Sequence, residues 1–430
     1  MNVTIKSPPG APSERARPGA VAAALAAAVP RSATAPDVEL VRLRRYRNDR
    51  LRAELRRRDY AAGLFCDAIN VRYATGSRNM QVWTLRNPAR YALVTADGPT
   101  VMFEFGGCDH LSRGLETIQE IRPTTSWFYF TSGPRIADHA KRWAAEIADL
   151  VGKHGGGNRR LAVDRVNPEG YCALQAQGID VRDGQEVAER ARAIKSPDEI
   201  ACMRAAIAVC EAGLARVRAA VVPGVTENKL LAILNEANIA GGGEYIETRL
   251  LTAGPRTNPW FQESSARPVA AGELVAIDTD MIGPHGFFAD MSRTFLCGDG
   301  KASAAQRELY GFAREQVATN AALLRPGIGF REFMEKSWAM PSRFVAHRYM
   351  SLVHGAGLCG EYPYIPYPQD YERKGYEGLI EENMTLCVES FIGDEHGGEG
   401  VKLEQLVLVT GDGPEPLTTF PFEERLLSRS

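Results

Sequence analysis

Three aspartates flank a short glycine-containing turn in the C-terminal half of the chain. Asp278 and Asp280 end an apolar segment, and Asp290 lies in the apolar segment that follows the turn at residues 283–286. Two strands joined by such a turn bring Asp278 or Asp280 beside Asp290. An unpaired carboxylate inside an apolar strand is costly. These aspartates therefore require a bound cation or strong hydrogen-bond donors.

Three more potential metal ligands occur in similarly apolar segments. His354 is followed by two nearby glycines, and Glu389 and Glu404 each lie within an apolar run. So many carboxylates around one imidazole repel one another unless about two divalent ions neutralise them. Bridging carboxylates hold such ions ~3.5–4 Å apart. The sequence therefore predicts a two-metal site, with Asp278 and Asp280 as alternative or joint ligands beside Asp290, His354, Glu389 and Glu404.

Length and composition limit the class of protein. The chain has 430 residues, which is long for a single hydrophobic core and favours two domains. Its formal charge of −2 gives no electrostatic reason to expect nucleic-acid binding. No apolar run approaches the ~20 residues that span a bilayer, so we expect no membrane insertion. The eight cysteines lack any CxxC pair, which favours free thiols in the reducing cytoplasm.

The first part of the chain alternates helical and strand-like segments. Residues 1–37 are rich in Ala, Pro and Arg and are expected to form a disordered tail. An amphipathic helix is predicted over residues 38–60 and another helix over 137–153. Short apolar runs bounded by Gly, Asp or Pro predict strands at residues 63–66, 91–95, 100–105 and 160–164. This alternation predicts an α/β N-terminal domain over residues 38–187.

A second domain is predicted over residues 188–430. Its first long helix has a clear start, because Ser196 can cap it, Pro197 suits the first helical position and Glu199 completes a capping box. The helix is expected to end near Pro223, and another is expected through residues 230–234. Strands and helices then alternate to the C-terminus.

Taken together, these motifs resemble the pita-bread metallopeptidase superfamily, which includes methionine aminopeptidase, prolidase and creatinase. The resemblance covers residues 38–430 and rests on segments 194–200, 290–294 and 354–358, with Glu389 and Glu404 following in family order. It implies a mixed α/β (α+β) fold, with a creatinase-like N-terminal domain followed by a pita-bread catalytic domain. The step from Asp278 to Asp290 is one residue longer than in the peptidases, which keeps Asp280 as a candidate ligand.

Several segments favour one branch of this superfamily. Two histidines that prolidases use are replaced here by Phe261 and Glu361, which weakens a peptidase interpretation. Segments 79–83, 244–251, 254–263, 354–359 and 417–422 look like the dimethylsulfoniopropionate lyase branch, which shares the Asp-x-Asp pattern. That resemblance implies cleavage of a sulfonium zwitterion to dimethyl sulfide and acrylate, with two divalent metal ions, iron foremost. It also implies a homodimer in which Trp83 acts in the partner's site.

Substrate binding and proton removal call for different side chains. A sulfonium cation favours aromatic faces, and Trp83, Trp260 and Tyr349 are candidate walls. The aspartate proposed as the lyase base, six residues after the metal histidine, is Gly360 here. Glu361, Tyr349 or a metal-bound hydroxide are the candidate replacements. Two alternatives remain open: a metallohydrolase of the Xaa-Pro peptidase or creatinase type acting on a small amide or peptide, and a non-catalytic pita-bread scaffold.

Overall fold

The computed structural model describes residues 38–427 and divides into two compact units. The N-terminal unit contains the described residues up to 201 together with 357–362, and the C-terminal unit contains 202–356 and the described residues from 363 onward. The tail expected at residues 1–37 lies outside the described residues. The domain boundary expected after residue 187 falls within helix α8 (Gln185–Ala193), whereas the division by contacts comes after residue 201.

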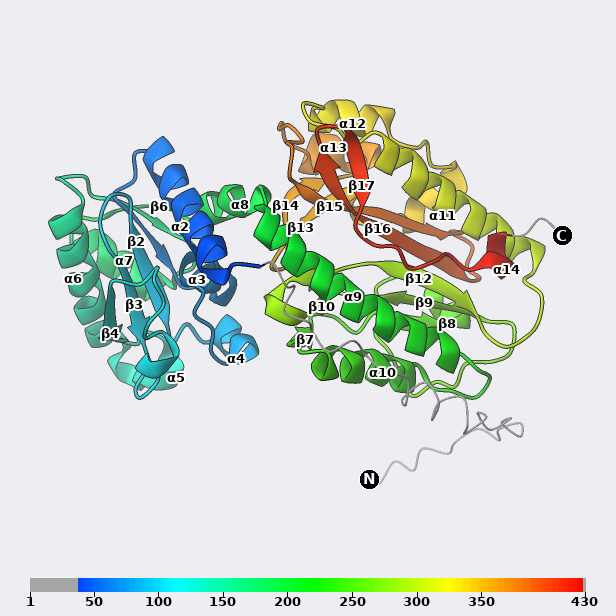
Figure 1. The fold of residues 1–430 in the computed structure, drawn as a ribbon, viewed down its shortest axis with the longest axis horizontal. Coiled ribbons are helices and arrows are strands. Elements are labelled where there is room, and N and C mark those ends of the chain that lie inside the picture. Colours follow the sequence, from blue (N-terminus) through cyan, green and yellow to red (C-terminus); the bar gives the residue numbers. More distant parts are fainter. Residues whose placement is uncertain (1–37, 428–430) are drawn as a thin grey trace, which may run out of the picture. The chain divides into compact units, whose positions relative to one another are not determined.

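One six-stranded sheet forms the centre of the N-terminal unit. Figure 1 shows α6 and α7 on one side of this sheet and α2 and α3 on the other. The strands run in the order β4 (Glu120–Pro123), β3 (Thr100–Glu104), β2 (Tyr91–Thr95), β1 (Ala62–Phe65), β5 (Arg160–Val163) and β6 (Asp180–Asp183). The helices are α2 (Leu40–Arg57), α3 (Ala68–Thr75), α4 (Gln81–Arg86), α5 (Tyr129–Ser132), α6 (Ile136–His154), α7 (Pro168–Ala176) and α8.

Apolar periodicity explains why these elements pack as they do. Strands β1, β2 and β3 are buried along their whole length. Helix α6 buries Ala140, Trp143, Ala144 and Ile147, which recur at the spacing of one helical face. Trp143 stacks on Trp127 with ring centres 4.0 Å apart. The four strands and the helix predicted over residues 137–153 are confirmed to within one residue at their ends, and the helix predicted over 38–60 is confirmed as α2, which ends three residues earlier.

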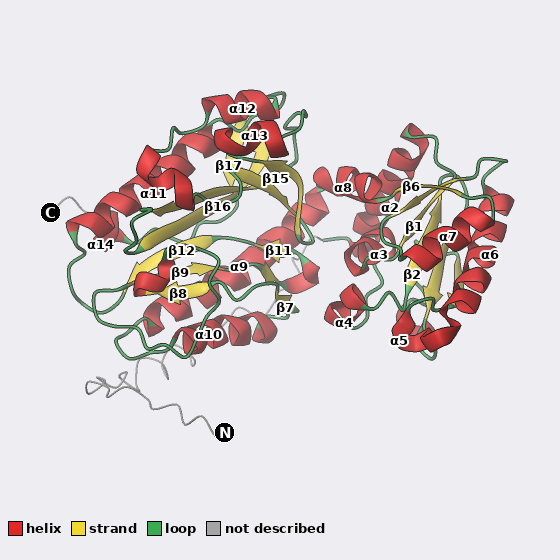
Figure 2. Cartoon of the chain, turned by 180° about the vertical axis from the view of Figure 1, so that it is seen from behind, coloured by secondary structure: helices red, strands yellow, loops and turns green. Residues whose placement is uncertain are grey.

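Three sheets make up the strand layer of the C-terminal unit (Figure 2). The first joins β11 (Phe288–Ala289), β10 (Met281–Ile282) and β7 (Tyr245–Ile246), and the second joins β12 (Ser292–Leu296), β9 (Leu274–Asp278) and β8 (Leu251–Ala253). The third contains β14 (Gly360–Ile365), whose first three residues are counted with the N-terminal unit, and β13 (Val353–Ala356), β15 (Thr385–Gly393), β16 (Gly400–Thr410) and β17 (Gly413–Pro416). The helices are α9 (Pro197–Ala220), α10 (Glu227–Ala240), α11 (Ala304–Ala322), α12 (Phe330–Lys336), α13 (Pro368–Lys374) and α14 (Glu424–Leu427).

Helix α9 begins as the sequence predicts. The backbone N–H of Glu199 donates to Ser196 Oγ at 3.3 Å, and the Ser196 N–H donates to the Glu199 carboxylate at 2.9 Å. This reciprocal pair is the predicted capping box, which satisfies two backbone donors that the helix leaves unpaired.

Strand pairing brings the predicted ligands onto adjoining strands. Strands β9 and β12 run antiparallel with Asp278 opposite Ser292, and β10 and β11 form the short hairpin beyond them. Asp280 joins β9 to β10 with φ of 38°, a left-handed conformation that bends the chain between the two strands. In the third sheet, β15 pairs antiparallel with both β13 and β16. The predicted hairpin between Asp278 and Asp290 is therefore confirmed.

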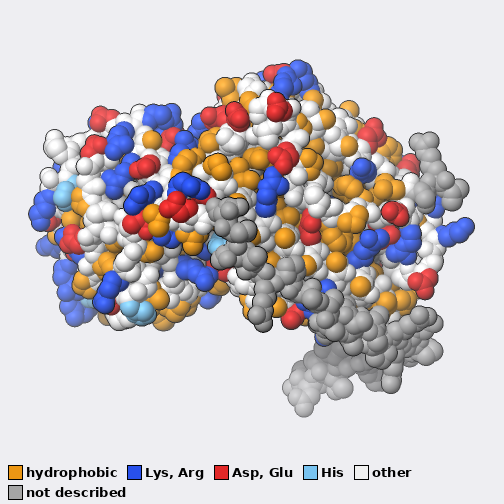
Figure 3. Space-filling model, in the orientation of Figure 1, with side chains coloured by type: hydrophobic (Ala, Val, Ile, Leu, Met, Phe, Trp, Pro, Cys, Tyr) orange, Lys and Arg blue, Asp and Glu red, His pale blue; other side chains and the backbone are white. Residues whose placement is uncertain are grey.

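The surface carries charges of both signs. On the face drawn in Figure 3, basic and acidic side chains are intermixed, and this face has no large area of a single sign. Within residues 38–427, no helix combines the length and the apolar character needed to cross a bilayer.

Candidate metal centre

Two glutamates lie directly opposite each other at the centre of the third sheet. The pairing of β15 with β16 sets Glu389 against Glu404, and both side chains are fully buried. Like charges directly opposite one another on antiparallel strands are destabilising. Apolar residues along both strands fix this register. The two buried carboxylates are therefore held together, and nearby positive charge would stabilise them.

His354 approaches the same glutamates from β13. Its Nε2 lies 3.1 Å from Glu389 Oε1 and 3.8 Å from Asp290 Oδ2. Its Nδ1 lies 2.9 Å from the backbone carbonyl of Gly355, to which only a protonated nitrogen can donate. That hydrogen bond orients the ring so that Nε2 faces the carboxylates, which is the arrangement of a metal-binding imidazole.

The three aspartates gather beside this group. Asp278, Asp280 and Asp290 each offer a carboxylate oxygen within 4.8 Å of the others. The backbone N–H of Asp280 donates to Asp290 Oδ1 at 3.2 Å, and the Thr248 hydroxyl donates to Asp280 Oδ2. The sequence left open whether Asp278, Asp280 or both lie beside Asp290. In the structure, both carboxylates do.

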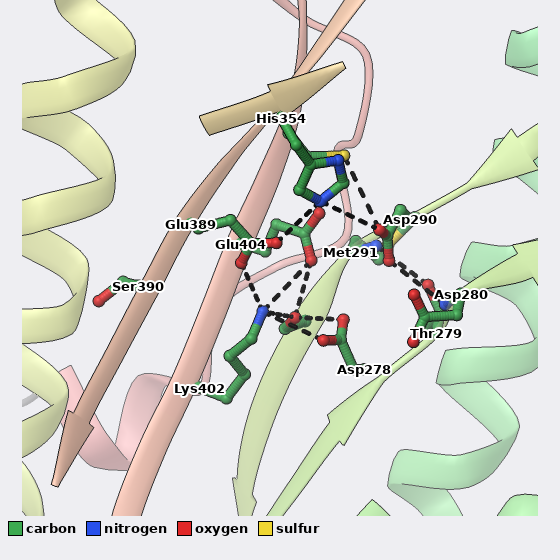
Figure 4. A network of polar contacts seen from close by, with 12 residues as sticks. Asp278, Thr279, Asp280, Asp290, Met291, His354, Glu389, Ser390, Lys402 and Glu404 are labelled. Atoms are coloured by element: carbon green, nitrogen blue, oxygen red, sulfur yellow. Dashed lines mark hydrogen bonds and ion pairs between the residues drawn. The ribbon is translucent and has the colours of Figure 1, made fainter. Parts of the chain in front are cut away.

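Two sets of ligand atoms share one residue. One set contains Asp278, Asp280 and Asp290, and the other contains Asp290, His354, Glu404 and Cys387, with all ligand atoms of each set within 4.8 Å of one another. Figure 4 shows Asp290 between the two aspartates on one side and His354 on the other. Glu389 lies next to the second set through its contact with His354. All six residues predicted as ligands therefore converge, and Asp290 belongs to both sets of possible ligand atoms.

Cys387 is a member of this cluster that the sequence analysis did not identify. Its Sγ lies 3.9 Å from Asp290 Oδ2, and the residue pairs across the sheet with His354. Burial raises the pKa of its thiol well above the usual value. The sequence could have predicted this position, because Cys387 lies two residues before Glu389 on the same strand and side chains at that spacing share a face.

Lys402 was also missed, although it lies at the centre of the carboxylates. Its fully buried ammonium lies 2.5 Å from Glu389, 3.2 Å from Asp278 and 3.5 Å from Glu404. It also donates to Ser292 Oγ at 2.6 Å. Its position could have been predicted from the sequence, because Lys402 lies two residues before Glu404 and both side chains therefore share one face of β16.

Burial and mutual repulsion change how these groups ionise when no metal is bound. Burial, with repulsion from Asp278, raises the pKa of Asp280 to about 7, and burial with repulsion from Glu389 raises that of Glu404 to about 8. Burial alone would lower the pKa of Lys402, but the surrounding carboxylates hold it well above its ordinary value. One lysine is therefore too little positive charge to ionise every carboxylate in the cluster.

The donor set fits divalent transition metals. Glu404 Oε1 is buried and has no hydrogen-bond partner among the described residues, which is costly unless something else binds it. Carboxylates combined with one imidazole suit ions such as Fe²⁺, Mn²⁺ and Zn²⁺. The residues present therefore fit a metal pair, which the two sets of possible ligand atoms would hold.

Aromatic side chains lie against this cluster on one side. The Tyr349 ring has its centre 4.4 Å from the Lys402 ammonium and stacks with Phe261 at 5.2 Å. Burial, then repulsion from Glu389, raises the pKa of the Tyr349 hydroxyl well above its usual value. Phe261 is half exposed and has a left-handed φ of 69°. Such strained backbone often occurs at functional sites.

The two predicted tryptophan walls occupy different surroundings. Trp260 is buried in the C-terminal unit, with its ring centre 5.9 Å from that of Phe391. Trp83 belongs to α4 of the N-terminal unit, where its ring lies 6.3 Å from Phe105 and 6.4 Å from Phe130. Trp260 thus packs in the core, whereas Trp83 belongs to a partly exposed aromatic group.

Glu361, a predicted base, is held by two cations within the N-terminal unit. One carboxylate oxygen lies 2.9 Å from Arg192 Nε and the other lies 2.5 Å from Lys195 Nζ. All three side chains are buried. With an oxygen bound to each cation, the carboxylate has the surroundings of a structural ion pair, and its role as a base stays a prediction.

The fold and the carboxylate-rich cluster are those of a pita-bread metalloenzyme. A model of metallopeptidase family M24 matches residues 201–411, and a model of the creatinase/prolidase N-terminal domain matches residues 47–194. A dimethylsulfoniopropionate lyase of Roseovarius nubinhibens is 41% identical over 396 residues, covering 91% of this chain and 89% of the relative. The same lyase of Roseobacter denitrificans is 41% identical over 394 residues, covering 90% and 88%. The chain therefore belongs to the M24 metallopeptidase family, as the sequence resemblance implied.

Solved structures support the same fold. An Xaa-Pro dipeptidase from Bacillus anthracis superposes with a TM-score of 0.70 at 20% identity, covering 88% of this chain and 99% of that one. A prolidase from Pyrococcus horikoshii gives 0.69 at 18% identity, with the same coverage of both chains. The predicted architecture, a creatinase-like domain followed by a pita-bread domain, is confirmed.

Raised carboxyl pKa values give the metal-free protein a distinctive pH dependence. The folded state holds the protons of Asp280 and Glu404 more tightly than the unfolded chain does, so the stability they contribute is present at low pH. It is lost as the pH rises through about 7 and about 8. We expect the melting temperature of chelator-treated protein to fall from about pH 4, where the unfolded carboxyl groups ionise, to about pH 8, and to change little through these groups above that. Mn²⁺-loaded protein should keep its melting temperature, because the ions replace those protons. Identical pH profiles with and without Mn²⁺ would contradict this.

The ion pairs of Glu361 predict a structural cost that a purely catalytic group would not have. Glu361→Ala removes the carboxylate from two buried cations and should lower the free energy of unfolding by about 3–5 kcal/mol. Asp97→Ala is the control, because its pair with Arg56 is exposed and should contribute at most about 1 kcal/mol. Urea unfolding of both variants measures the difference. Equal stability of the two variants would argue against the structural role.

Proposed function

We propose that this protein is a metal-dependent lyase that cleaves dimethylsulfoniopropionate to dimethyl sulfide and acrylate by β-elimination. The observation that carries the proposal is 41% identity to two lyases of that name over about nine tenths of both chains. The convergence of all six predicted ligands supports it, because a substrate with a carboxylate needs fixed positive charge to bind.

The metal pair would be iron, held by the two ligand sets that share Asp290. Asp278 and Asp280 complete one set, and His354 and Glu404 complete the other with Glu389 beside them. When bound, the ions would supply Lewis-acid charge that stabilises negative charge developing on the substrate carboxylate. Side chains of the protein would orient the sulfonium group and remove a proton.

The proposed reaction balances without an oxidant or a second substrate. A base removes a proton from the carbon next to the carboxylate, and the electron pair left behind forms the new carbon–carbon double bond. The bond between carbon and sulfur breaks, and its electrons leave with neutral dimethyl sulfide. Acrylate is the other product.

Aromatic faces would hold the sulfonium cation. Tyr349 borders the carboxylate cluster, and the half-exposed ring stacked on it belongs to Phe261. A desolvated cation against such rings gains about 2 kcal/mol or more. We therefore add Phe261, whose ring is half exposed, to the proposed walls Trp83, Trp260 and Tyr349.

Neither of the two side chains predicted as the base is a strong base in its surroundings, and a metal-bound hydroxide stays the third proposed candidate. The raised pKa of Tyr349 keeps its hydroxyl protonated near neutral pH, and the Glu361 carboxylate is bound by Arg192 and Lys195. Both stay proposed bases, and Gly360 stands where the lyase branch carries an aspartate. We therefore expect slow turnover of dimethylsulfoniopropionate.

We further propose that the protein acts as a cytoplasmic homodimer on a small-molecule substrate, without nucleic acid or membrane. The aromatic group around Trp83 supports dimerisation, because Phe130 and the neighbouring Met80 and Val82 expose apolar surface on the N-terminal unit. Trp83 would then complete the partner's site. All eight cysteines are free, which suits a reducing compartment.

Hydrolysis of a small amide or peptide is the alternative function. The superposition on prolidases supports the fold it needs. Against it, Phe261 and Glu361 replace the two histidines that prolidases use, and neither offers an imidazole for proton transfer at neutral pH. A non-catalytic scaffold would need no metal, so metal analysis of purified protein tests that third possibility.

Release of dimethyl sulfide is the direct test of the proposed function. Protein reconstituted with Fe²⁺ under anaerobic conditions should release the gas from dimethylsulfoniopropionate, measured by headspace gas chromatography. His354→Ala should lower the rate by at least about a hundredfold, because it removes the imidazole from one ligand set. No release above a metal-stripped control would overturn the proposal, and release of proline from Xaa-Pro dipeptides would favour the hydrolase instead.

Gly360→Asp tests the missing base. Gly360 is exposed and its backbone is not left-handed, so an aspartate fits there without strain. A positioned general base contributes about 10²–10⁴ in rate, so we expect kcat for dimethyl sulfide release to rise at least about tenfold. Gly360→Asn is the matched control, because it has the same size and shape without a carboxylate. Equal kcat values for the two variants would show that the base lies elsewhere.

A further inference from the structure

The ammonium of Lys402 is bound by groups from four strands. It contacts Asp278 on β9, Glu389 on β15 and Glu404 on its own strand β16, and it donates to Ser292 on β12. The Ser292 hydroxyl in turn lies 2.6 Å from Asp278 Oδ1 and 2.8 Å from Glu404 Oε2. Figure 4 shows the lysine extending into the cluster from below, with its tip among the carboxylates.

Each glutamate divides its two oxygens between this lysine and the ligand side. Oε2 of Glu389 and Oε2 of Glu404 face Lys402. Oε1 of Glu389 faces His354 Nε2, and Oε1 of Glu404 has no hydrogen-bond partner among the described residues. The lysine thereby occupies one oxygen of each carboxylate and leaves the other directed toward the ligand atoms. This is the behaviour of a positioning residue.

Lys402 also changes the net charge of the cluster. Five carboxylates converge here, and Lys402 offsets one of them. Four negative charges remain, which two divalent ions neutralise completely. A neutral residue at position 402 would leave one buried negative charge unbalanced, and buried unbalanced charge is strongly unfavourable.

We infer that Lys402 is a positioning residue that sets the net charge of the site, so that it selects a pair of divalent ions over ions of higher charge. This rests on the proposed two-metal occupancy and is independent of the substrate. Because the ammonium contacts the ligands directly, each additional positive charge on a bound ion meets its repulsion at short range. Loss of that repulsion should favour trivalent ions more than divalent ones.

The test compares the affinity for Mn²⁺ with the affinity for Tb³⁺ in folded variants. Lys402→Met removes the charge with little change of volume, and it should raise the ratio of Tb³⁺ to Mn²⁺ affinity by at least about tenfold. Lys402→Arg and Ser292→Ala are matched controls, because both keep the positive charge while changing hydrogen bonds. A purely structural role would weaken the binding of both ions alike and leave the ratio unchanged.

Removing a carboxylate provides the complementary variant. Glu389→Gln should lower the Tb³⁺ to Mn²⁺ ratio, and the double variant Lys402→Met with Glu389→Gln should return it toward the wild-type value. This comparison decides the matter even if Lys402→Met alone does not fold. An unchanged ratio in Lys402→Met, or a double variant that behaves like Glu389→Gln, would overturn the inference. Wild-type protein that binds neither ion would instead overturn the proposed metal occupancy.

Discussion

Repulsion among buried carboxylates constrains the C-terminal unit more than any other interaction described in it. Glu389 and Glu404 face each other because the register of β15 and β16 is fixed by apolar side chains along both strands. The glutamates cannot separate without breaking that register. The strands can therefore pair in this way only if bound protons or cations offset the repulsion between the carboxylates, and Lys402 with a metal pair meets that requirement when all of them are ionised.

The aspartates join this arrangement through a local distortion of the backbone. In a straight strand, residues two apart share a face, so Asp278 and Asp280 would project side by side. The left-handed conformation of Asp280 turns the chain at the end of β9 and starts the hairpin that returns to Asp290. The hydrogen bond from its backbone N–H to Asp290 holds this turn together. The longer step between Asp278 and Asp290 thus brings the Asp280 carboxylate into the cluster without displacing that of Asp278.

The sequence predicts which acidic side chains converge with His354, because charged side chains inside apolar strands are costly enough to be conspicuous. It predicts the start of α9 for a similar reason, since the capping box is a local pattern. Lys402 escapes this reasoning because an ammonium two residues before a glutamate is also typical of an exposed strand. The ion pairs of Glu361 could not be predicted from a local pattern, because its partners Arg192 and Lys195 are more than 160 residues away in sequence. Only the fold reveals that its carboxylate is already bound.

The ligand cluster alone does not determine the reaction, because fixed positive charge serves hydrolysis and elimination equally well. What separates the two is the group that moves the proton and the surface that holds the leaving group. Phe261 in place of a histidine removes a proton carrier and supplies an aromatic face, which suits a substrate with a sulfonium cation. Gly360 leaves the proton-transfer role without a carboxylate at the expected position. A site with this combination retains orientation and charge stabilisation, so its rate should be limited by proton removal and not by departure of the sulfide.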